Sequence, residues 1–229
     1  MTPVRRSLRR LRDRARSLTL LAPIVRAADR LALRWVATER FDGRDPGERA
    51  YLDQYAAVLL PKTSGRVLDL GCGHGYLTWE IAARAEVSEV VGIDRIADFR
   101  CAHPKISYRT QDLTAKPHLP AGFDVVVATE FIEHISEAAL LALLPFIRDA
   151  LSEGGLFVGS TPPNPTTAET FSGSPFHRRE YQPLALRALL SRHFADVEIT
   201  SHGAAFMTWI ARRPPSQSRS HERQGRTTP

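Results

Sequence analysis

A glycine-rich turn between an apolar run and a helix-like segment constrains the fold of this chain most strongly. Residues 67–76 read Val-Leu-Asp-Leu-Gly-Cys-Gly-His-Gly-Tyr, which places glycine at positions 71, 73 and 75. Glycines at alternate positions let the backbone turn tightly and approach a ligand without Cβ atoms in the way. The N-terminus of the following helix presents N–H groups that have no partner within the helix. The pattern predicts a buried strand, a ligand-binding loop and a helix, in that order.

Strand-like and helix-like segments alternate from residue 66 onward. Such alternation is typical of a parallel sheet covered by helices. The sequence His202-Gly203-Ala204 is a hairpin signal, so the last two strands are expected to pair as a reversed edge of this sheet. A further helix is expected at residues 46–60. We expect strands at 66–70, 89–94, 106–109, 123–129, 156–160, 197–201 and 205–211, and helices at 76–84, 136–151 and 183–193.

Charge divides the chain into three parts. The net charge is +8 over residues 1–40, −6 over residues 41–210 and +4 over residues 211–229, within a total of +6. The mildly acidic central part argues against a phosphate-binding face on the domain itself. We therefore expect a basic, helical N-terminal segment at 1–40, one globular domain at 41–211 and a disordered tail at 212–229.

The N-terminal segment contains the pattern of a basic amphipathic helix at residues 3–18. A membrane-surface helix, a nucleic-acid-binding arm and a targeting peptide all fit this pattern, as does a loosely ordered tail. No apolar run approaches the roughly 20 residues of a membrane span. The two cysteines, Cys72 and Cys101, provide neither a disulfide framework nor a zinc spacing. We expect a cytoplasmic protein, with peripheral membrane contact through residues 3–18 as an alternative.

The glycine turn is not that of a nucleotide-phosphate site. Tyr76 stands where the third glycine of a dinucleotide fingerprint would be, and no Gly-Lys-Ser or Gly-Lys-Thr occurs. Asp69 precedes the first glycine, where a carboxylate disfavours a pyrophosphate and suits a cationic ligand. Polar residues also end the next strands, at Asp94, Asp112 and Thr129. Because ligands bind at the carboxyl ends of strands in open α/β sheets, these residues are expected around one site.

The ordered segments Val-Leu-Asp-Leu-Gly-Cys-Gly-His-Gly, Val-Val-Gly-Ile-Asp, Gln-Asp-Leu and Phe-Asp-Val-Val-Val-Ala-Thr-Glu resemble the motifs of class I methyltransferases that use S-adenosylmethionine (SAM). The resemblance covers residues 47–211. It implies a doubly wound, Rossmann-like α/β fold with a seven-stranded sheet, mostly parallel with one antiparallel edge strand, and helices on both faces. Only about ten residues, 95–104, separate the second and third strands, so the helix usual there is expected to be very short.

The same resemblance implies where SAM would bind. Asp69 and the loop Gly71–Gly75 are expected near the methionine moiety, Asp94 at the ribose, and Asp112 at the adenine. The full set of expected cofactor-binding residues is Asp69, Gly71, Cys72, Gly73, Gly75, Asp94, Arg95, Asp112, Leu113 and Thr129.

The segment after the fourth strand predicts the acceptor side. Glu130, Glu133 and His134 are spaced i, i+3 and i+4, which places them on one face of a helical turn. Two carboxylates and an imidazole form half of a divalent-metal site. A second cluster at residues 175–181 contains His177, which is expected opposite.

The pairing of Glu-x-x-Glu-His with His-x-x-Glu-Tyr is similar to ubiquinone-biosynthesis O-methyltransferases and to small-RNA 3′-terminal 2′-O-methyltransferases. This similarity implies Glu130, Glu133, His134 and His177 as ligands of Mg²⁺ or Mn²⁺, with Glu133, His134 and His177 as catalytic residues. The alternative is that Glu133 and His134 only pack and cap beside the cofactor. The proline-rich loop from Thr161 to Ser174 is expected to line the acceptor pocket with Phe171, Phe176 and Tyr181.

Three functions follow from these patterns. An enzyme that methylates a small molecule on a hydroxyl oxygen is favoured by the acidic domain and the aromatic loop. An RNA 2′-O-methyltransferase would use the basic tails to bind the RNA phosphate backbone, although the tails lack interleaved aromatic residues for stacking on bases. A SAM-binding scaffold without catalysis is the third, and the intact set of strand-end carboxylates argues against it.

Overall fold

The computed structural model describes residues 46–115, 118–166, 168 and 174–215. The expected amphipathic helix at residues 3–18 lies outside this part of the chain, as do the rest of the segment at 1–40 and the tail beyond residue 215.

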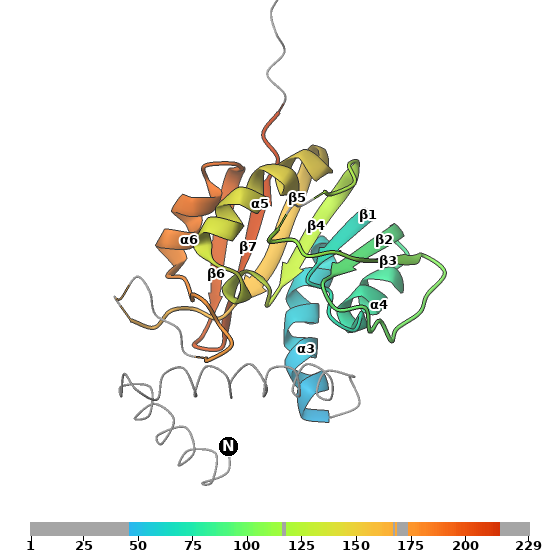
Figure 1. Cartoon of the computed structure of the whole chain (residues 1–229), viewed down its shortest axis with the longest axis horizontal. Coiled ribbons are helices and arrows are strands. Elements are labelled where there is room, and N and C mark those ends of the chain that lie inside the picture. The colour runs from blue at the N-terminus through green and yellow to red at the C-terminus, as the bar shows by residue number, and fades with distance from the viewer. Residues whose placement is uncertain (1–45, 116–117, 167, 169–173, 216–229) are drawn as a thin grey trace, which may run out of the picture.

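Seven strands form one sheet in the order β3-β2-β1-β4-β5-β7-β6 (Figure 1). Neighbouring strands from β3 to β5 pair in parallel, whereas β7 runs antiparallel to both β5 and β6. The reversed strand therefore lies between β5 and the edge strand β6. This confirms the expected α/β fold with a mostly parallel, seven-stranded sheet. The strands are β1 (Gly65–Leu70), β2 (Val87–Asp94), β3 (Ile106–Thr110), β4 (Phe123–Thr129), β5 (Leu151–Thr161), β6 (Ala195–His202) and β7 (Phe206–Arg212).

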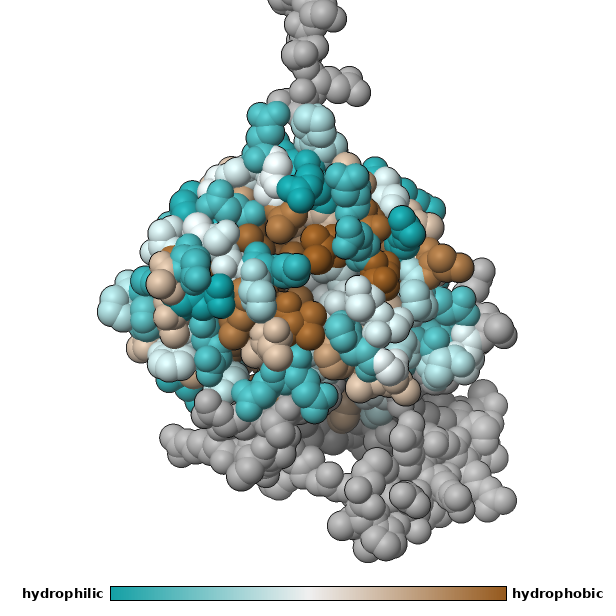
Figure 2. All heavy atoms as spheres, turned by 180° about the vertical axis from the view of Figure 1, so that it is seen from behind, coloured by the Kyte–Doolittle hydropathy of each residue, from teal (hydrophilic) through white to brown (hydrophobic). Residues whose placement is uncertain are grey.

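Helices cover both faces of the sheet because successive strand residues point to opposite sides. Leu68 and Leu70 of β1 belong to the cluster with α5 (Glu137–Ala150) and α6 (Pro183–Leu190), on the side facing the viewer in Figure 1. Val67 belongs to the second cluster, with α3 (Pro46–Leu59) and α4 (Tyr76–Ala82). Figure 2 shows apolar side chains gathered in the middle of this second face. Two 3₁₀ turns, η1 (Leu60–Lys62) and η2 (Ile132–His134), complete these elements.

Element boundaries follow local chemistry where they differ from the expected ones. The strand expected at 156–160 begins at Leu151, and Gly154 with φ of +73° lies inside it, where the pairing with β4 shifts register. The helix expected to reach residue 193 ends at Leu190, because Arg192 and His193 then donate backbone hydrogen bonds to the third residue before them. Ser136 caps the N-terminus of α5, since its Oγ accepts a hydrogen bond from the backbone N–H of Ala139 at 3.2 Å.

The connection between β2 and β3 contains no helix at all. Instead, Phe99 stacks on Tyr108 of β3, with ring centroids 4.4 Å apart and planes 7° from parallel. Among the described residues, every helix falls short of the length and apolarity that a bilayer crossing requires.

Candidate functional site

The glycine loop follows β1 at the carboxyl edge of the sheet. Gly71, Gly73 and Gly75 all have positive φ, at +70°, +55° and +87°, a region that L side chains rarely adopt. The loop is fixed to β2 because the N–H groups of Gly71 and Cys72 donate to the carbonyl of Ile93, at 2.8 and 3.2 Å. A Cβ atom at Gly73 would meet nothing within 4 Å, so this glycine lies beside open space. The loop thus presents its backbone where a ligand can approach.

Asp94 at the end of β2 is tied to the same loop. Its Oδ2 accepts a hydrogen bond from the N–H of Gly73 at 2.9 Å, and its Oδ1 accepts one from the N–H of Ile96 at 2.9 Å. Arg95 follows it and is exposed. The structure therefore brings the expected ribose-binding carboxylate and the glycine loop into direct contact.

Asp69 lies beneath the loop and is almost completely buried. Its Oδ2 accepts a hydrogen bond from the Thr78 hydroxyl of α4 at 2.7 Å. Burial raises the pKa of Asp69 to about 7. Cys72 is a free thiol whose pKa burial raises even further above its usual range. A buried carboxyl of this kind is stabilised in its ionised form by a nearby positive charge.

The expected adenine side is more open. Asp112 is exposed, and its Oδ1 accepts hydrogen bonds from both the N–H and the hydroxyl of Thr114, at 2.8 and 2.7 Å. These hydrogen bonds lower the pKa of the Asp112 carboxyl. Leu113 beside it is buried in the core. At the end of β4, the Thr129 hydroxyl is buried without a hydrogen-bond partner.

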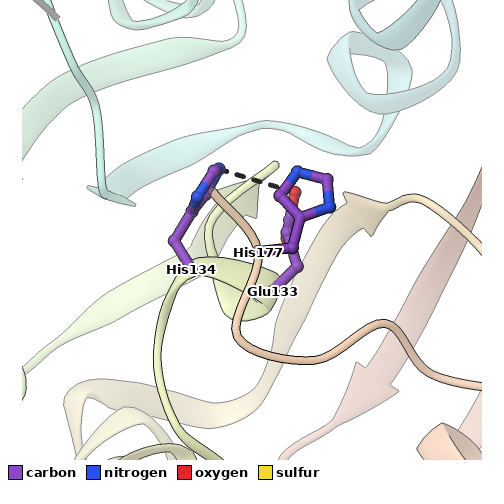
Figure 3. A group of neighbouring side chains, drawn as sticks. All are labelled: Glu133, His134 and His177. Atoms are coloured by element: carbon purple, nitrogen blue, oxygen red, sulfur yellow. Dashed lines mark ion pairs between the residues drawn. The ribbon is translucent and has the colours of Figure 1, made fainter. Parts of the chain in front are cut away.

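Glu133, His134 and His177 form one cluster (Figure 3). Each offers a ligand atom, and these atoms lie within 4.8 Å of one another. The two imidazole rings are 5.0 Å apart at an interplanar angle of 83°. The structure thus brings together the three residues expected to be catalytic, from η2 and from the segment before α6.

The Glu133 carboxyl is fully buried. Its Oε2 accepts a hydrogen bond from the Thr161 hydroxyl at 3.0 Å, whereas Oε1 has no hydrogen-bond partner and lies 3.9 Å from Nε2 of His134. Burial raises the pKa of Glu133 well above its usual range, and the nearby Glu130 adds to this effect. An orphaned oxygen in such a place is costly unless a ligand or a proton satisfies it.

The two histidines each engage Nδ1 with an acceptor of the protein. Nδ1 of His134 lies 3.1 Å from the carbonyl oxygen of Phe176, and Nδ1 of His177 lies 2.6 Å from Oε1 of Glu180. The His134 side chain is 43% exposed, yet desolvation of its ring lowers its pKa below the usual value. This lowered pKa favours the neutral form of the His134 ring at pH 7.

Glu130 does not join the cluster. It precedes η2 with φ of +48°, and its Oε1 accepts a hydrogen bond from the Ser160 hydroxyl at 2.9 Å. The expected helical turn with all three side chains on one face is instead a 3₁₀ turn that begins at Ile132. The left-handed backbone at Glu130 directs this carboxylate to β5.

The loop after β5 contributes less than expected within the described residues. Phe171 lies outside them. Tyr181 is buried, and its carbonyl accepts a hydrogen bond from the N–H of Asn164 at 2.9 Å, which holds the two ends of the loop together. Phe176 is half-buried and contributes its carbonyl to His134.

Sequence reasoning missed two partners of the cluster, Thr161 and Glu180, and the partner of Glu130, Ser160. Ser160 and Thr161 end β5 as Thr129 ends β4, so the same strand-end argument could have found them. Glu180 stands three residues after His177, but nothing in that spacing shows that the two side chains meet.

Comparison with known proteins places the chain in a family. A family model described as a methyltransferase domain matches residues 44–215. The chain belongs to the class I SAM-dependent methyltransferase family.

Two curated relatives are more specific. A protein of Mycolicibacterium smegmatis, described as a "probable S-adenosylmethionine-dependent methyltransferase", is 34% identical over 67% of this chain and 62% of its own. A ubiquinone biosynthesis O-methyltransferase of Cereibacter sphaeroides is 32% identical over 49% of this chain and 47% of its own. The matched region thus spans between about half and three fifths of these relatives.

Solved structures agree on the fold. The N-methyltransferase NodS of Bradyrhizobium japonicum, in complex with S-adenosyl-L-homocysteine (SAH), superimposes with a TM-score of 0.61 at 17% identity, over 80% of this chain and 97% of its own. The DhpI–SAH complex gives a TM-score of 0.61 at 20% identity, over 84% of this chain and 94% of its own.

Proposed function

We propose that this protein transfers the methyl group of SAM to a hydroxyl oxygen of a small-molecule acceptor. Family membership supports methyl transfer, and the likeness to ubiquinone biosynthesis O-methyltransferases supports oxygen as the acceptor atom. The single observation that carries the proposal is the cluster of Glu133, His134 and His177 at the carboxyl edge of the same sheet as the glycine loop.

The cofactor half of the proposal rests on charge. Asp69 and Asp94 place two carboxylates against a loop that has no phosphate-binding lysine. SAM carries a sulfonium and an ammonium, which such carboxylates stabilise. The loop Gly71–Gly75, which includes Cys72, would hold the methionine end of SAM. Asp94 and Arg95 would lie at the ribose, and Asp112 would lie at the adenine.

The acceptor half rests on proton acceptors. In an in-line displacement the acceptor oxygen bonds to the methyl carbon, the carbon–sulfur bond breaks, and the sulfonium leaves as the neutral thioether SAH. The hydroxyl proton must go to a base. The lowered pKa of His134 favours its neutral ring, and Nδ1 donates to the Phe176 carbonyl, so the lone pair lies on Nε2. Nε2 can accept that proton once the substrate is held at roughly 3–3.5 Å from the methyl group.

The same atoms fit a divalent cation. The orphaned Oε1 of Glu133 and the two imidazoles supply one carboxylate and two nitrogen donors within 4.8 Å of one another, a donor set that suits Mn²⁺ and related ions. A bound cation would lower the pKa of the acceptor hydroxyl. Glu130 lies outside this group of three and accepts a hydrogen bond from the Ser160 hydroxyl through Oε1, so its part in holding the cation stays a prediction.

Labelled SAM incubated with a protein-free metabolite extract tests the proposal. We expect label in a small-molecule product whose new methyl group is an ether, and loss of that product in the His134→Gln variant. His202→Gln is the matched control, because His202 lies on β6 and contacts Thr208 rather than the cluster. Label only on nitrogen or carbon would contradict O-methylation, and label only in RNA would favour the alternative acceptor.

Chelation tests the cation separately. Activity that is lost in a chelator and restored by Mn²⁺ is the expected result. Undiminished activity in the chelator would contradict the cation and leave proton transfer to His134 and Glu133 as the chemistry of the cluster.

A further inference from the structure

Glu180 is a buried residue that faces His177 rather than the cofactor loop. It is 5% exposed, and its Oε1 lies 2.6 Å from Nδ1 of His177. A carboxylate oxygen accepts hydrogen bonds, so Nδ1 of His177 is the donor in this pair. The lone pair of the ring is then on Nε2, because the partner of one ring nitrogen sets the state of the other.

His134 is held in the same way by a different acceptor. The Phe176 carbonyl cannot donate, so Nδ1 of His134 also carries its proton and Nε2 its lone pair. The orphaned Oε1 of Glu133 is a further acceptor in the cluster. Two imidazoles in one tautomer and a carboxylate oxygen therefore present lone pairs together, which suits a positively charged ligand.

The backbone of the segment that carries His177 is held without Glu180. The N–H groups of Arg178 and Arg179 donate to the Glu133 carbonyl at 2.6 and 3.3 Å, which ties this segment to η2 through the backbone. The contact with Glu180 adds something that the backbone cannot supply, namely the choice of which ring nitrogen is protonated.

We propose that Glu180 is a positioning residue that fixes His177 in the Nδ1–H tautomer and so presents its Nε2 lone pair to a divalent cation. The inference rests on the proposed function for the role of that lone pair and on geometry alone for the tautomer. Hydrogen-bonded carboxylates behind metal-binding histidines act in this way in other proteins, and their removal costs about 10–100-fold in metal affinity.

Nitrogen-15 NMR of histidine-labelled protein at pH 8.5 tests the tautomer without substrate or cation. The His177 signals are assigned by their loss in His177→Gln. We expect the Nδ1–H tautomer in the wild-type protein and a shift toward Nε2–H in Glu180→Leu, with His134 unchanged in both. An Nε2–H tautomer of His177 in the wild-type protein would overturn the inference even if Glu180→Leu does not fold.

Titration with Mn²⁺ alone tests whether Glu180 supports cation binding. We expect Glu180→Leu to weaken Mn²⁺ binding about 10–100-fold, and the exposed β6 variant Glu198→Leu to leave it unchanged. Equal affinity of the wild-type and Glu180→Leu proteins would contradict the inference. SAH binding is measured in parallel, since a protein that shows the expected tautomer but binds no SAH supports this inference and contradicts the proposed function.

Discussion

The buried carboxyl of Asp69 makes the stability of the protein depend on pH. Its pKa is raised to about 7 by burial, against about 3.9 in an unfolded chain. Between these values the folded state keeps a proton that the unfolded state has lost, so the free energy of unfolding falls as pH rises. We expect the wild-type protein to lose on the order of a few kcal/mol between pH 4.5 and 7.5 through this group, at about 1.4 kcal/mol per pKa unit.

The variant Asp69→Asn isolates this effect, because other buried acids such as Glu133 remain in both proteins. Urea unfolding of the apo proteins at several pH values gives the two slopes. The wild-type slope is expected to be the steeper one, and identical slopes would show that Asp69 ionises in the fold as it does in the unfolded chain.

Gly71 has a left-handed backbone, and the space where a side chain would begin is already filled. Its φ is +70°, and a Cβ atom would lie 2.4 Å from Cδ2 of Phe131. Gly154 has nearly the same φ, +73°, but nothing within 4 Å of its Cβ position. We expect Gly154→Ala to cost about 1–2 kcal/mol from the backbone alone, and Gly71→Ala to cost clearly more because the ring must move. Chemical denaturation measures both, and equal costs would contradict the packing of Phe131 against the loop.

Two hydrogen bonds hold the connection between β2 and β3 against the glycine loop. His74, 6% exposed, has Nδ1 2.7 Å from the carbonyl of Asp98, and its own carbonyl accepts from the N–H of Arg100 at 2.9 Å. We expect His74→Ala to speed amide hydrogen exchange over residues 96–104. We also expect it to weaken SAH binding, since the glycine loop and this connection border the proposed cofactor site.

Tyr108→Phe is the variant to compare with His74→Ala. It removes the hydrogen bond from the Tyr108 hydroxyl to the Cys101 carbonyl at 2.7 Å and the longer one to the Gly75 carbonyl at 3.5 Å, but it keeps the stack on Phe99. Its effect on exchange is expected to stay smaller than that of His74→Ala. The reverse order would show that Tyr108, and not His74, anchors this connection.

The elements that could be predicted from the sequence are those whose signals are local. The strand at 123–129 agrees at both ends because its apolar run is bounded by Gly122 and by polar Thr129. The start of β5 could not be predicted, since a glycine such as Gly154 commonly follows a helix end. In the structure Gly154 lies inside a bulged strand. The separation of Glu130 from Glu133 depends on a positive φ at Glu130 and on Ser160 thirty residues away, and neither is visible in local spacing.

For the molecule as a whole, binding of the cofactor product must stabilise the fold. A ligand that binds only the folded state raises the free energy of unfolding by about 2.7 kcal/mol at a concentration of 100 times its Kd. This free energy grows with the logarithm of the ligand concentration once the site is saturated. We therefore expect the unfolding temperature to rise steadily with the logarithm of the SAH concentration. A rise with adenosine that equals the rise with SAH would show that the methionine end finds no partner in the Gly71–Gly75 loop.

Calorimetric titration with SAH measures whether the glycine loop and Asp94 form a cofactor site. We predict one saturable site in the wild-type protein and a loss of roughly 10-fold or more in Asp94→Ala, which removes hydrogen bonds to a charged group. Asp149→Ala on α5 is the control, because its carboxylate pairs with the neighbouring Arg148. No binding by the wild-type protein, or equal affinities of Asp94→Ala and Asp149→Ala, would show that SAH does not bind at this edge of the sheet.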